Sequence, residues 1–303
     1  MSELKISSPF TLADAQATGL SSDDMRSLRR RGDVREVVRG IYVSADVPDT
    51  LDLRAAALTR VVPPRAVACR RTAAWLHGVD VLALGSHVEV PPVELLVPAG
   101  TAAIRRVCVI GYSGVLCDDE VVEINGVLAT SPVRTTLDLG RLLPLVDGVA
   151  AVDAMLHAQL VTIADLMDVL PRFRGYRHKL RLDRALDLAD GRAESPQESR
   201  LRIRLVVYAK LPRPEVQYVV PFARGEFRLD LAYVEAKVAV EYDGTEHHSE
   251  PADVEYDRWR RNLIGRLGWK FHVARSHDVL SGWMDFTAKV ASSLYSSGYR
   301  PAA

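Results

Sequence analysis

The chain has 303 residues, enough for two or three domains, and its contents of 48% hydrophobic and 26% charged residues are those of an ordinary globular protein. Its formal net charge is zero, which excludes a bulk polycation, so any binding to nucleic acid has to come from local patches. No run of about 18 apolar residues predicts a membrane span, and residues 1–10 lack a signal-peptide pattern. We therefore expect a cytoplasmic protein that does not span a membrane. Three cysteines without CxxC spacing predict neither a zinc site nor a disulfide framework.

Residues 1–60 predict a small helical unit followed by a β-ribbon. A capped helix is expected from Asp23 to Arg31, with acidic residues in its first turn and arginines in its last turn, as the helix dipole favours. Two short strands around Arg39-Gly40 follow it. This order is typical of a winged helix-turn-helix, whose second helix enters the major groove of DNA. The alternative is a protein-binding wing domain with a solvated helix end. The residues expected near DNA phosphates are Arg26, Arg29, Arg30 and Arg35.

Residues 61–190 predict a middle domain of mixed helices and strands, without a catalytic constellation. One of its segments, Phe173–Lys179, is basic and contains two aromatic residues. This composition suits either contact with nucleic acid or a simple link between domains.

Three carboxylates, Asp230, Glu241 and Asp243, lie on two adjacent segments in which apolar and polar residues alternate with the period of a strand. The alternation predicts one buried and one displayed face on each strand. The connection Val234–Lys237 is short enough for a hairpin that sets Asp230 opposite Glu241. Such neighbours lie roughly 5 Å apart and like charges repel there, so a cation is needed. Oxygen ligands favour Mg²⁺ or Mn²⁺, and the pattern therefore predicts a metal-dependent phosphodiesterase.

Glu198 has two interpretations that the sequence leaves open. Ser195-Pro-Gln-Glu198 is a capping-box pattern, in which the Glu198 side chain reaches back to the start of the helix. Glu198 also shares a helix face with Leu201 and Leu205, which are expected to face the sheet.

The C-terminal region resembles the PD-(D/E)XK nuclease superfamily, specifically the branch of very-short-patch-repair endonucleases. The resembling stretches, in order, are Ser195–Glu198, Arg228–Leu231, Val240–His248, Asp257–Leu263, Gly268-Trp269 and Val273–Ser276. The N-terminal and middle regions are similar to AbiEi-type antitoxins, which are DNA-binding autoregulators. That likeness is carried by Leu12–Ala15, Gly19-Leu20, Arg39–Tyr42, Arg71–Ala74 and Thr130–Thr135.

These resemblances imply an α/β multi-domain protein. Residues 1–60 would form a winged helix-turn-helix, residues 61–190 a middle α+β domain, and residues 191–303 a restriction-endonuclease-like α/β domain with a mixed central sheet.

The nuclease resemblance also implies roles for individual residues. Asp230 and Glu241 correspond to the metal ligands of the superfamily, and Asp243 stands where its usual lysine would be. His247 or His248 would then replace that lysine as the proton carrier, since a histidine pKa near neutrality suits the role. In related nucleases a helix glutamate at the position of Glu198 approaches the metal. Arg258 and Arg261, one turn apart on the next helix, are expected either to bind phosphate or to form exposed pairs with Asp257 and Glu255. Arg275, at the end of the final strand, is a further expected phosphate contact.

Three functions follow from these patterns. The leading one is a DNA-binding protein with a Mg²⁺- or Mn²⁺-dependent endonuclease domain, in phage defence, a toxin–antitoxin system or DNA repair. The alternative is a non-enzymatic AbiEi-like antitoxin or repressor with a degenerate nuclease fold, which the missing lysine favours. The third is a toxin whose nuclease is restrained by its own N-terminal half. The expected partners are DNA and either a cognate toxin or a second copy of the chain.

Overall fold

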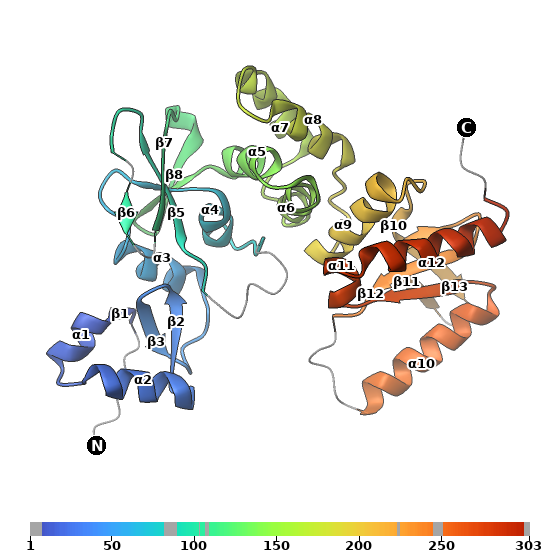
Figure 1. Ribbon diagram of the computed structural model, residues 1–303, viewed down its shortest axis with the longest axis horizontal. Coiled ribbons are helices and arrows are strands. Elements are labelled where there is room, and N and C mark those ends of the chain that lie inside the picture. Colours follow the sequence, from blue (N-terminus) through green and yellow to red (C-terminus); the bar gives the residue numbers. More distant parts are fainter. Residues whose placement is uncertain are drawn as a thin grey trace. The chain divides into compact units, whose positions relative to one another are not determined.

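The computed structural model describes residues 8–81, 90–102, 104–106, 109–222, 225–244 and 251–299, and Figure 1 shows its elements. Contacts within the chain divide it into two compact units. The first unit comprises Met1–Leu139 and Leu160–Arg172, and the second comprises Gly140–Gln159 and Phe173–Ala303. The expected three domains, with boundaries after residues 60 and 190, stay a prediction. Among the described helices, none is long and apolar enough to cross a membrane.

The first unit begins with two short helices and a β-ribbon. Strand β1 is followed by helices α1 and α2 and by strands β2 and β3, which form a three-stranded sheet in the order β1-β3-β2. Each helix begins at a complete capping box, Thr11 with Asp14 and Ser21 with Asp24. Gly32, with a φ of 78°, ends α2 in the left-handed conformation that glycine adopts easily. The expected helix and ribbon are thus confirmed. Their bounds are β1 Phe10–Thr11, α1 Leu12–Ala17, α2 Ser22–Arg31, β2 Val34–Val38 and β3 Ile41–Ser44.

A six-stranded sheet in the order β6-β7-β5-β4-β9-β8 makes up the rest of the first unit, with helices α3, α4 and α7 and with α5 as far as Leu139. Val37 and Ile41 of the ribbon lie in the same hydrophobic core as Leu58 of α3 and Leu95 of β5. The ribbon therefore packs on the elements that follow it. The bounds are α3 Leu51–Thr59, β4 Val67–Ala68, α4 Arg70–Leu76, β5 Val93–Pro98, β6 Arg105–Arg106, β7 Val109–Gly114, β8 Val121–Ile124, β9 Val127–Thr130, α5 Pro132–Leu142 and α7 Ile163–Val169.

The second unit is built on a four-stranded mixed sheet in the order β10-β11-β12-β13, in which only the β12–β13 pair is parallel. Helices cover both faces, as Figure 1 shows for α12 and α10. Leu201 of α9 and Val290 of α12 share one core with Val240, while Ile264 of α10 shares another with Leu229. The bounds are α6 Leu145–His157, α8 Lys179–Leu188, α9 Pro196–Ile203, β10 Glu215–Phe222, β11 Gly225–Tyr233, β12 Val238–Tyr242, α10 Pro251–Arg266, β13 Lys270–Ala274, α11 Ser276–Leu280 and α12 Trp283–Ser296.

The mixed α/β architecture agrees with the expected fold class, and β11 alternates as expected, with Arg228 exposed between the buried Phe227 and Leu229. The expected displayed face of β12 was wrong. Val238, Ala239, Val240 and Glu241 of β12 are all buried. The strand is central in its sheet and helices cover both faces, so even its acidic side chain is removed from water.

Helices α6 and α8, which the sequence assigned to the middle domain, pack in the second unit. Val149 of α6, Leu188 of α8 and Ile203 of α9 share one hydrophobic core. Helix α9 therefore has two packing partners, the sheet and α6, and this places α6 on the C-terminal side of the division.

Within the first unit, one arginine is buried between two carboxylates, and this generates a prediction. Arg134 on α5 is 3% exposed, and its guanidinium lies 2.7 Å from Glu120 and 2.9 Å from Asp138. Arg134→Met leaves both acids buried without this cation, so we expect a loss of about 3–5 kcal/mol in the free energy of unfolding. Urea denaturation measures it. Arg172→Met, which breaks an exposed pair with Asp119, is the matched control and should cost less than about 1 kcal/mol. Equal effects of the two variants would contradict the prediction.

Candidate functional site

Asp230 and Glu241 lie on neighbouring strands of the second unit, as the hairpin prediction required. The pairs Tyr233 with Val238 and Leu231 with Val240 set the register of β11 against β12. The Tyr242 N–H donates to Oδ2 of Asp230 at 2.9 Å, which ties the carboxylate to the backbone of β12. The expected cross-strand register is therefore confirmed.

Glu241 is held by an arginine that the sequence did not single out. Arg260 on α10 makes a bidentate pair with it, with Nη1 3.0 Å from Oε2 and Nη2 2.7 Å from Oε1. Nη2 of Arg260 also donates to the Arg228 carbonyl at 2.6 Å. Helical spacing contained the signal, because Arg260 lies four residues before the buried Ile264 and shares its helix face. Two parallel N–H···O contacts make this the strongest kind of side-chain ion pair.

Glu198 approaches the same place from α9, and its capping role is only half formed. Ser195 Oγ accepts from the Glu198 N–H at 3.2 Å, but the Glu198 carboxylate accepts from the N–H of Glu194, one residue before the cap, at 3.1 Å. The same oxygen accepts from Nε2 of Gln217 at 2.8 Å. Gln217 lies within β10 with a φ of 55°, a left-handed conformation that is uncommon for such a residue. Gln217 is therefore a further site residue that strand alternation could not indicate.

The proximity of these acids is reflected in the pKa of Asp230. Burial first, and then the negative charges of Glu198 and Glu241, raise this pKa to about 7, while the Tyr242 N–H and Arg260 act in the opposite direction. The structure thus brings together Glu198, Asp230 and Glu241, which we call the acidic site. Among the described residues, Arg260 is the cation that pairs with it through Glu241.

The other expected site residues are placed differently. Asp243 lies 3.7 Å from Nη2 of Arg261. Arg261, which was expected to contact phosphate, therefore faces a carboxylate of its own chain. Arg275 begins α11, where its N–H donates to Asp278 at 2.9 Å and its side chain is exposed. His247, His248 and the side chain of Arg258 lie outside the described residues. Within the described part of the chain, no three His, Cys, Asp or Glu side chains gather closely enough to hold a metal ion.

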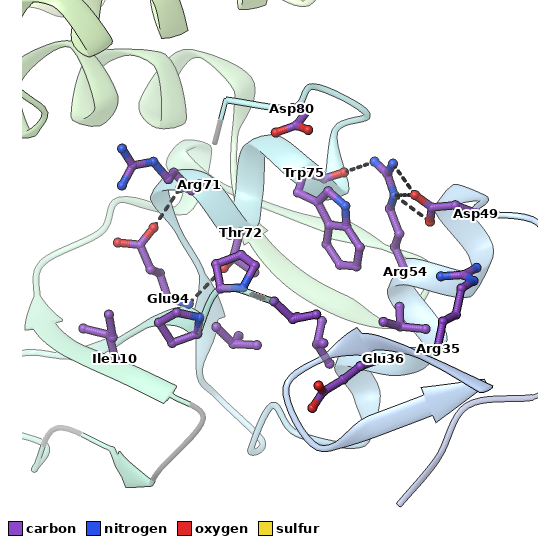
Figure 2. A pocket seen from close by; sticks show the side chains of 16 residues that line it. Arg35, Glu36, Asp49, Arg54, Arg71, Thr72, Trp75, Asp80, Glu94 and Ile110 are labelled. Atoms are coloured by element: carbon purple, nitrogen blue, oxygen red, sulfur yellow. Dashed lines mark hydrogen bonds and ion pairs between the residues drawn. The ribbon is translucent and has the colours of Figure 1, made fainter. Parts of the chain in front are cut away.

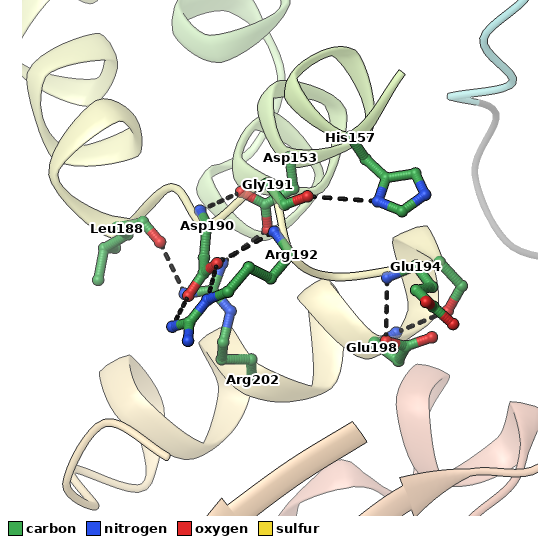
Figure 3. Close-up of polar contacts among 10 residues, drawn as sticks. Asp153, His157, Leu188, Asp190, Gly191, Arg192, Glu194, Glu198 and Arg202 are labelled. Atoms are coloured by element: carbon green, nitrogen blue, oxygen red, sulfur yellow. Dashed lines mark hydrogen bonds and ion pairs between the residues drawn. The ribbon is translucent and has the colours of Figure 1, made fainter. Parts of the chain in front are cut away.

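Helix α9 is fixed beyond Glu198 by a buried ion pair (Figure 3). Nη2 of Arg202 lies 2.6 Å from Oδ2 of Asp153 on α6, and Nη1 of Arg202 donates to the Leu188 carbonyl at 2.7 Å. Oδ1 of Asp153 accepts from the Asp190 N–H at 2.7 Å. The pKa of Asp153 is raised, because the effect of its burial outweighs the opposing effect of the Arg202 charge. These contacts join α9 to α6 and to the connection after α8, and we call the three segments the frame around α9. The frame fixes the position of Glu198.

The arginines expected to contact DNA in the first unit fall into two groups. Arg29 lies 3.2 Å from Glu36 and its guanidinium stacks on the Tyr42 ring, while Arg35 donates to the Val47 carbonyl at 2.8 Å. These two side chains stabilise the ribbon. Arg26 is exposed and pairs only with exposed Asp23. Arg30 is also exposed, and no described residue pairs with it.

Arg39 was not among the expected DNA contacts, although it belongs with Arg30. It is exposed at the β2–β3 turn beside Gly40, and no described residue pairs with it. Its place before the glycine of a ribbon turn was the signal available in the sequence.

The first unit also contains a cavity of about 490 Å³ between β2, α4 and β5, shown in Figure 2. This volume is within the range of small-molecule sites. The charged groups along it are largely engaged already. Arg54 binds Asp49 at 2.7 Å and stacks over the Trp75 ring, and Glu94 accepts from the Arg71 N–H at 3.0 Å.

Two known proteins match most of this chain. They are the uncharacterized proteins MT2308 and Rv2248 from two strains of Mycobacterium tuberculosis, each 32% identical over 242 residues, or 79% of this chain and 84% of the relative. The chain belongs to the family of these mycobacterial proteins. Residues 66–188 match the family model of the AbiEi antitoxin C-terminal domain, which supports the AbiEi part of the resemblance. The matched region ends at Leu188, whose carbonyl accepts from Arg202 of the frame around α9. The nuclease part of the resemblance stays a prediction.

The raised pKa of Asp230 predicts a pH dependence of stability. A carboxyl group whose pKa is higher in the folded than in the unfolded state stabilises the fold below about pH 4, and this contribution is lost as the pH rises towards 7. Without divalent metal, the free energy of unfolding of the wild type should therefore fall by on the order of 2 kcal/mol more than that of Asp230→Asn between pH 4 and 8. This is less than the full pKa shift corresponds to, because Asp230 is partly exposed. Urea denaturation across this range measures the difference, and parallel pH profiles of the two proteins would contradict it.

Proposed function

We propose that this protein binds DNA and hydrolyses phosphodiester bonds at the acidic site of its second unit, with a hard divalent cation bound there. The observation that carries the proposal is the burial of Asp230 between Glu198 and Glu241, which raises its pKa to about 7. Among the described residues, the three acids of this partly buried site carry more negative charge than Arg260 neutralises. Such a site favours either a proton or a metal ion.

The donor chemistry fits Mg²⁺ or Mn²⁺. Carboxylate oxygens are the ligands these ions prefer, and Mg²⁺ commonly binds only one or two carboxylates and keeps several waters. Asp230 and Glu241 would hold the ion, and Glu198, oriented by Gln217, would add negative charge beside it. The bound ion would polarise the phosphate and lower the pKa of an attacking water. Asp243, His247 and His248 remain proposed participants, with a histidine as the proton carrier.

DNA would be located by the first unit, whose helix pair and ribbon we propose to be a winged helix-turn-helix. Arg30 and Arg39 support this proposal, because they present two exposed guanidinium groups on the second helix and on the ribbon turn. The match to the AbiEi antitoxin domain supports a role in a toxin–antitoxin or defence system, with DNA and a cognate toxin as partners.

A second function is favoured by one specific observation. Arg260 engages both oxygens of Glu241, and an internal guanidinium of this kind supplies the positive charge that a metal would otherwise provide. In that case the second unit is a degenerate nuclease fold, and the protein is a non-enzymatic AbiEi-like antitoxin or repressor.

Cleavage of supercoiled plasmid in Mg²⁺ or Mn²⁺ separates the two functions. We expect metal-dependent nicking by the wild type, reduced at least about 100-fold in Asp230→Asn and Glu241→Gln, because each variant removes a charged ligand of the metal. Glu226→Gln, which alters an exposed acid on the same strand as Asp230, is the matched control and should cut normally. If the wild type never cuts, or all three variants cut alike, the nuclease proposal fails and the regulator remains.

The DNA-binding part is tested by fluorescence anisotropy with a duplex from the protein's own promoter. Arg30→Ala and Arg39→Ala should each weaken binding several-fold. Each should also lower the slope of log K against log salt by about one, as expected for the loss of one phosphate contact. Arg172→Ala serves as the control, since Arg172 is exposed but paired with Asp119. Wild-type affinity in both variants would argue against a groove contact by α2 and the ribbon.

A further inference from the structure

We infer that the turn before α8 is a second binding site for the phosphodiester backbone of DNA, located in the second unit and separate from the winged helix-turn-helix. This inference rests on the proposed function and names a further contact for the same substrate. The site, here called the basic turn, comprises Arg174, Arg177, His178 and Arg181.

The basic turn concentrates positive charge in a chain whose net charge is zero. The segment from Phe173 to Leu182 contains no acidic residue. No described residue makes an ion pair with Arg174 or Arg177, and both side chains are exposed. Arg181 donates to the Leu143 carbonyl at 3.1 Å, a neutral group that leaves its charge uncompensated.

The backbone of the turn brings these cations close together. Gly175 and His178 both adopt left-handed conformations, with φ of 82° and 65°, so the chain bends sharply into α8. Arg141 donates to the Arg177 carbonyl at 3.2 Å and so fixes the turn to the end of α5. The pKa of His178 is lowered, first by burial and then by Arg181, Arg177 and Arg141, which is consistent with converging positive charge.

An aromatic and an aliphatic side chain accompany the cations. Tyr176 is 37% exposed, and its ring is held at 4.9 Å from the buried Phe173 ring. Leu180, in the first turn of α8, is 85% exposed. Guanidinium groups that match phosphate oxygens, next to a rigid exposed ring, are the combination that nucleic-acid surfaces use.

The acidic site explains why the second unit needs such a surface. Carboxylates at that site repel phosphates, and the described arginines around it are engaged by acids: Arg260 by Glu241, Arg261 by Asp243 and Arg228 by Glu194. Their charge is already compensated within the unit. The basic turn is therefore the better candidate for attracting DNA to this unit, and it favours a linear polyanion since its arginines recur every three to four residues.

The test is binding of a labelled random-sequence duplex by the full chain in EDTA, so that cleavage plays no part. The double variant Arg174→Ala/Arg177→Ala should lose about tenfold in affinity near 0.1 M salt, and the slope of log K against log salt should fall by about two. Arg181 is left unchanged because its contact with Leu143 is structural. The matched control is Arg184→Ala/Arg213→Ala, which removes two exposed arginines that both pair with Asp187.

Several outcomes overturn the inference. The basic turn is not a DNA site if the first double variant binds like the wild type, if both double variants lose equally, or if the wild type does not bind the duplex. Stronger competition by poly-glutamate than by DNA, lost in the first double variant, would assign the turn to an acidic protein instead. Thermal unfolding of both variants checks that folding is intact. If the wild type binds the duplex and the first double variant binds it more weakly, but the wild type does not cleave plasmid, only the proposed nuclease function is contradicted.

Discussion

The burial of carboxylates in a sheet that helices cover on both faces is the constraint on which the second unit depends. Asp230 and Glu241 lie on strands whose buried apolar residues belong to two hydrophobic cores, so their charges must be compensated locally. Arg260 and the Tyr242 N–H supply part of that compensation. Because Glu198 adds another acid, the site holds a proton readily, as the raised pKa of Asp230 indicates. The same excess of negative charge is the basis on which we propose a metal ion there.

The position of Glu198 depends on a part of the chain that the sequence assigned elsewhere. Helix α9 packs on the sheet with one side and on α6 with the other, and the buried pair of Arg202 with Asp153 joins the two helices. Buried pairs of this kind do not necessarily increase stability, but they disfavour alternative packings, since either charge alone would be costly. The AbiEi-matched region thus contributes to the framework of the acidic site.

Arginine has three different uses in this protein. Some guanidinium groups are buried and compensate acids, as Arg134 and Arg202 do. Others brace the backbone by donating to carbonyls, as Arg35 does. A third group, including Arg30 and Arg174, is exposed without a partner among the described residues. A net charge of zero therefore conceals separate cationic surfaces, and the partner of each guanidinium decides which of them can attract DNA.

Local patterns in the sequence indicated a helix cap at Ser21 or Ser22, the cap at Ser195, the ribbon around Gly40 and the hairpin that sets Asp230 opposite Glu241. These features depend on contacts within a few residues, which spacing and residue type specify. Tertiary structure decided that β12 is buried on both faces, that Arg260 is the arginine that holds Glu241, and that α6 packs with α9. Each of these follows from which elements pack together. A period-two or period-3.6 pattern shows that a residue faces a neighbour, but not which neighbour it meets.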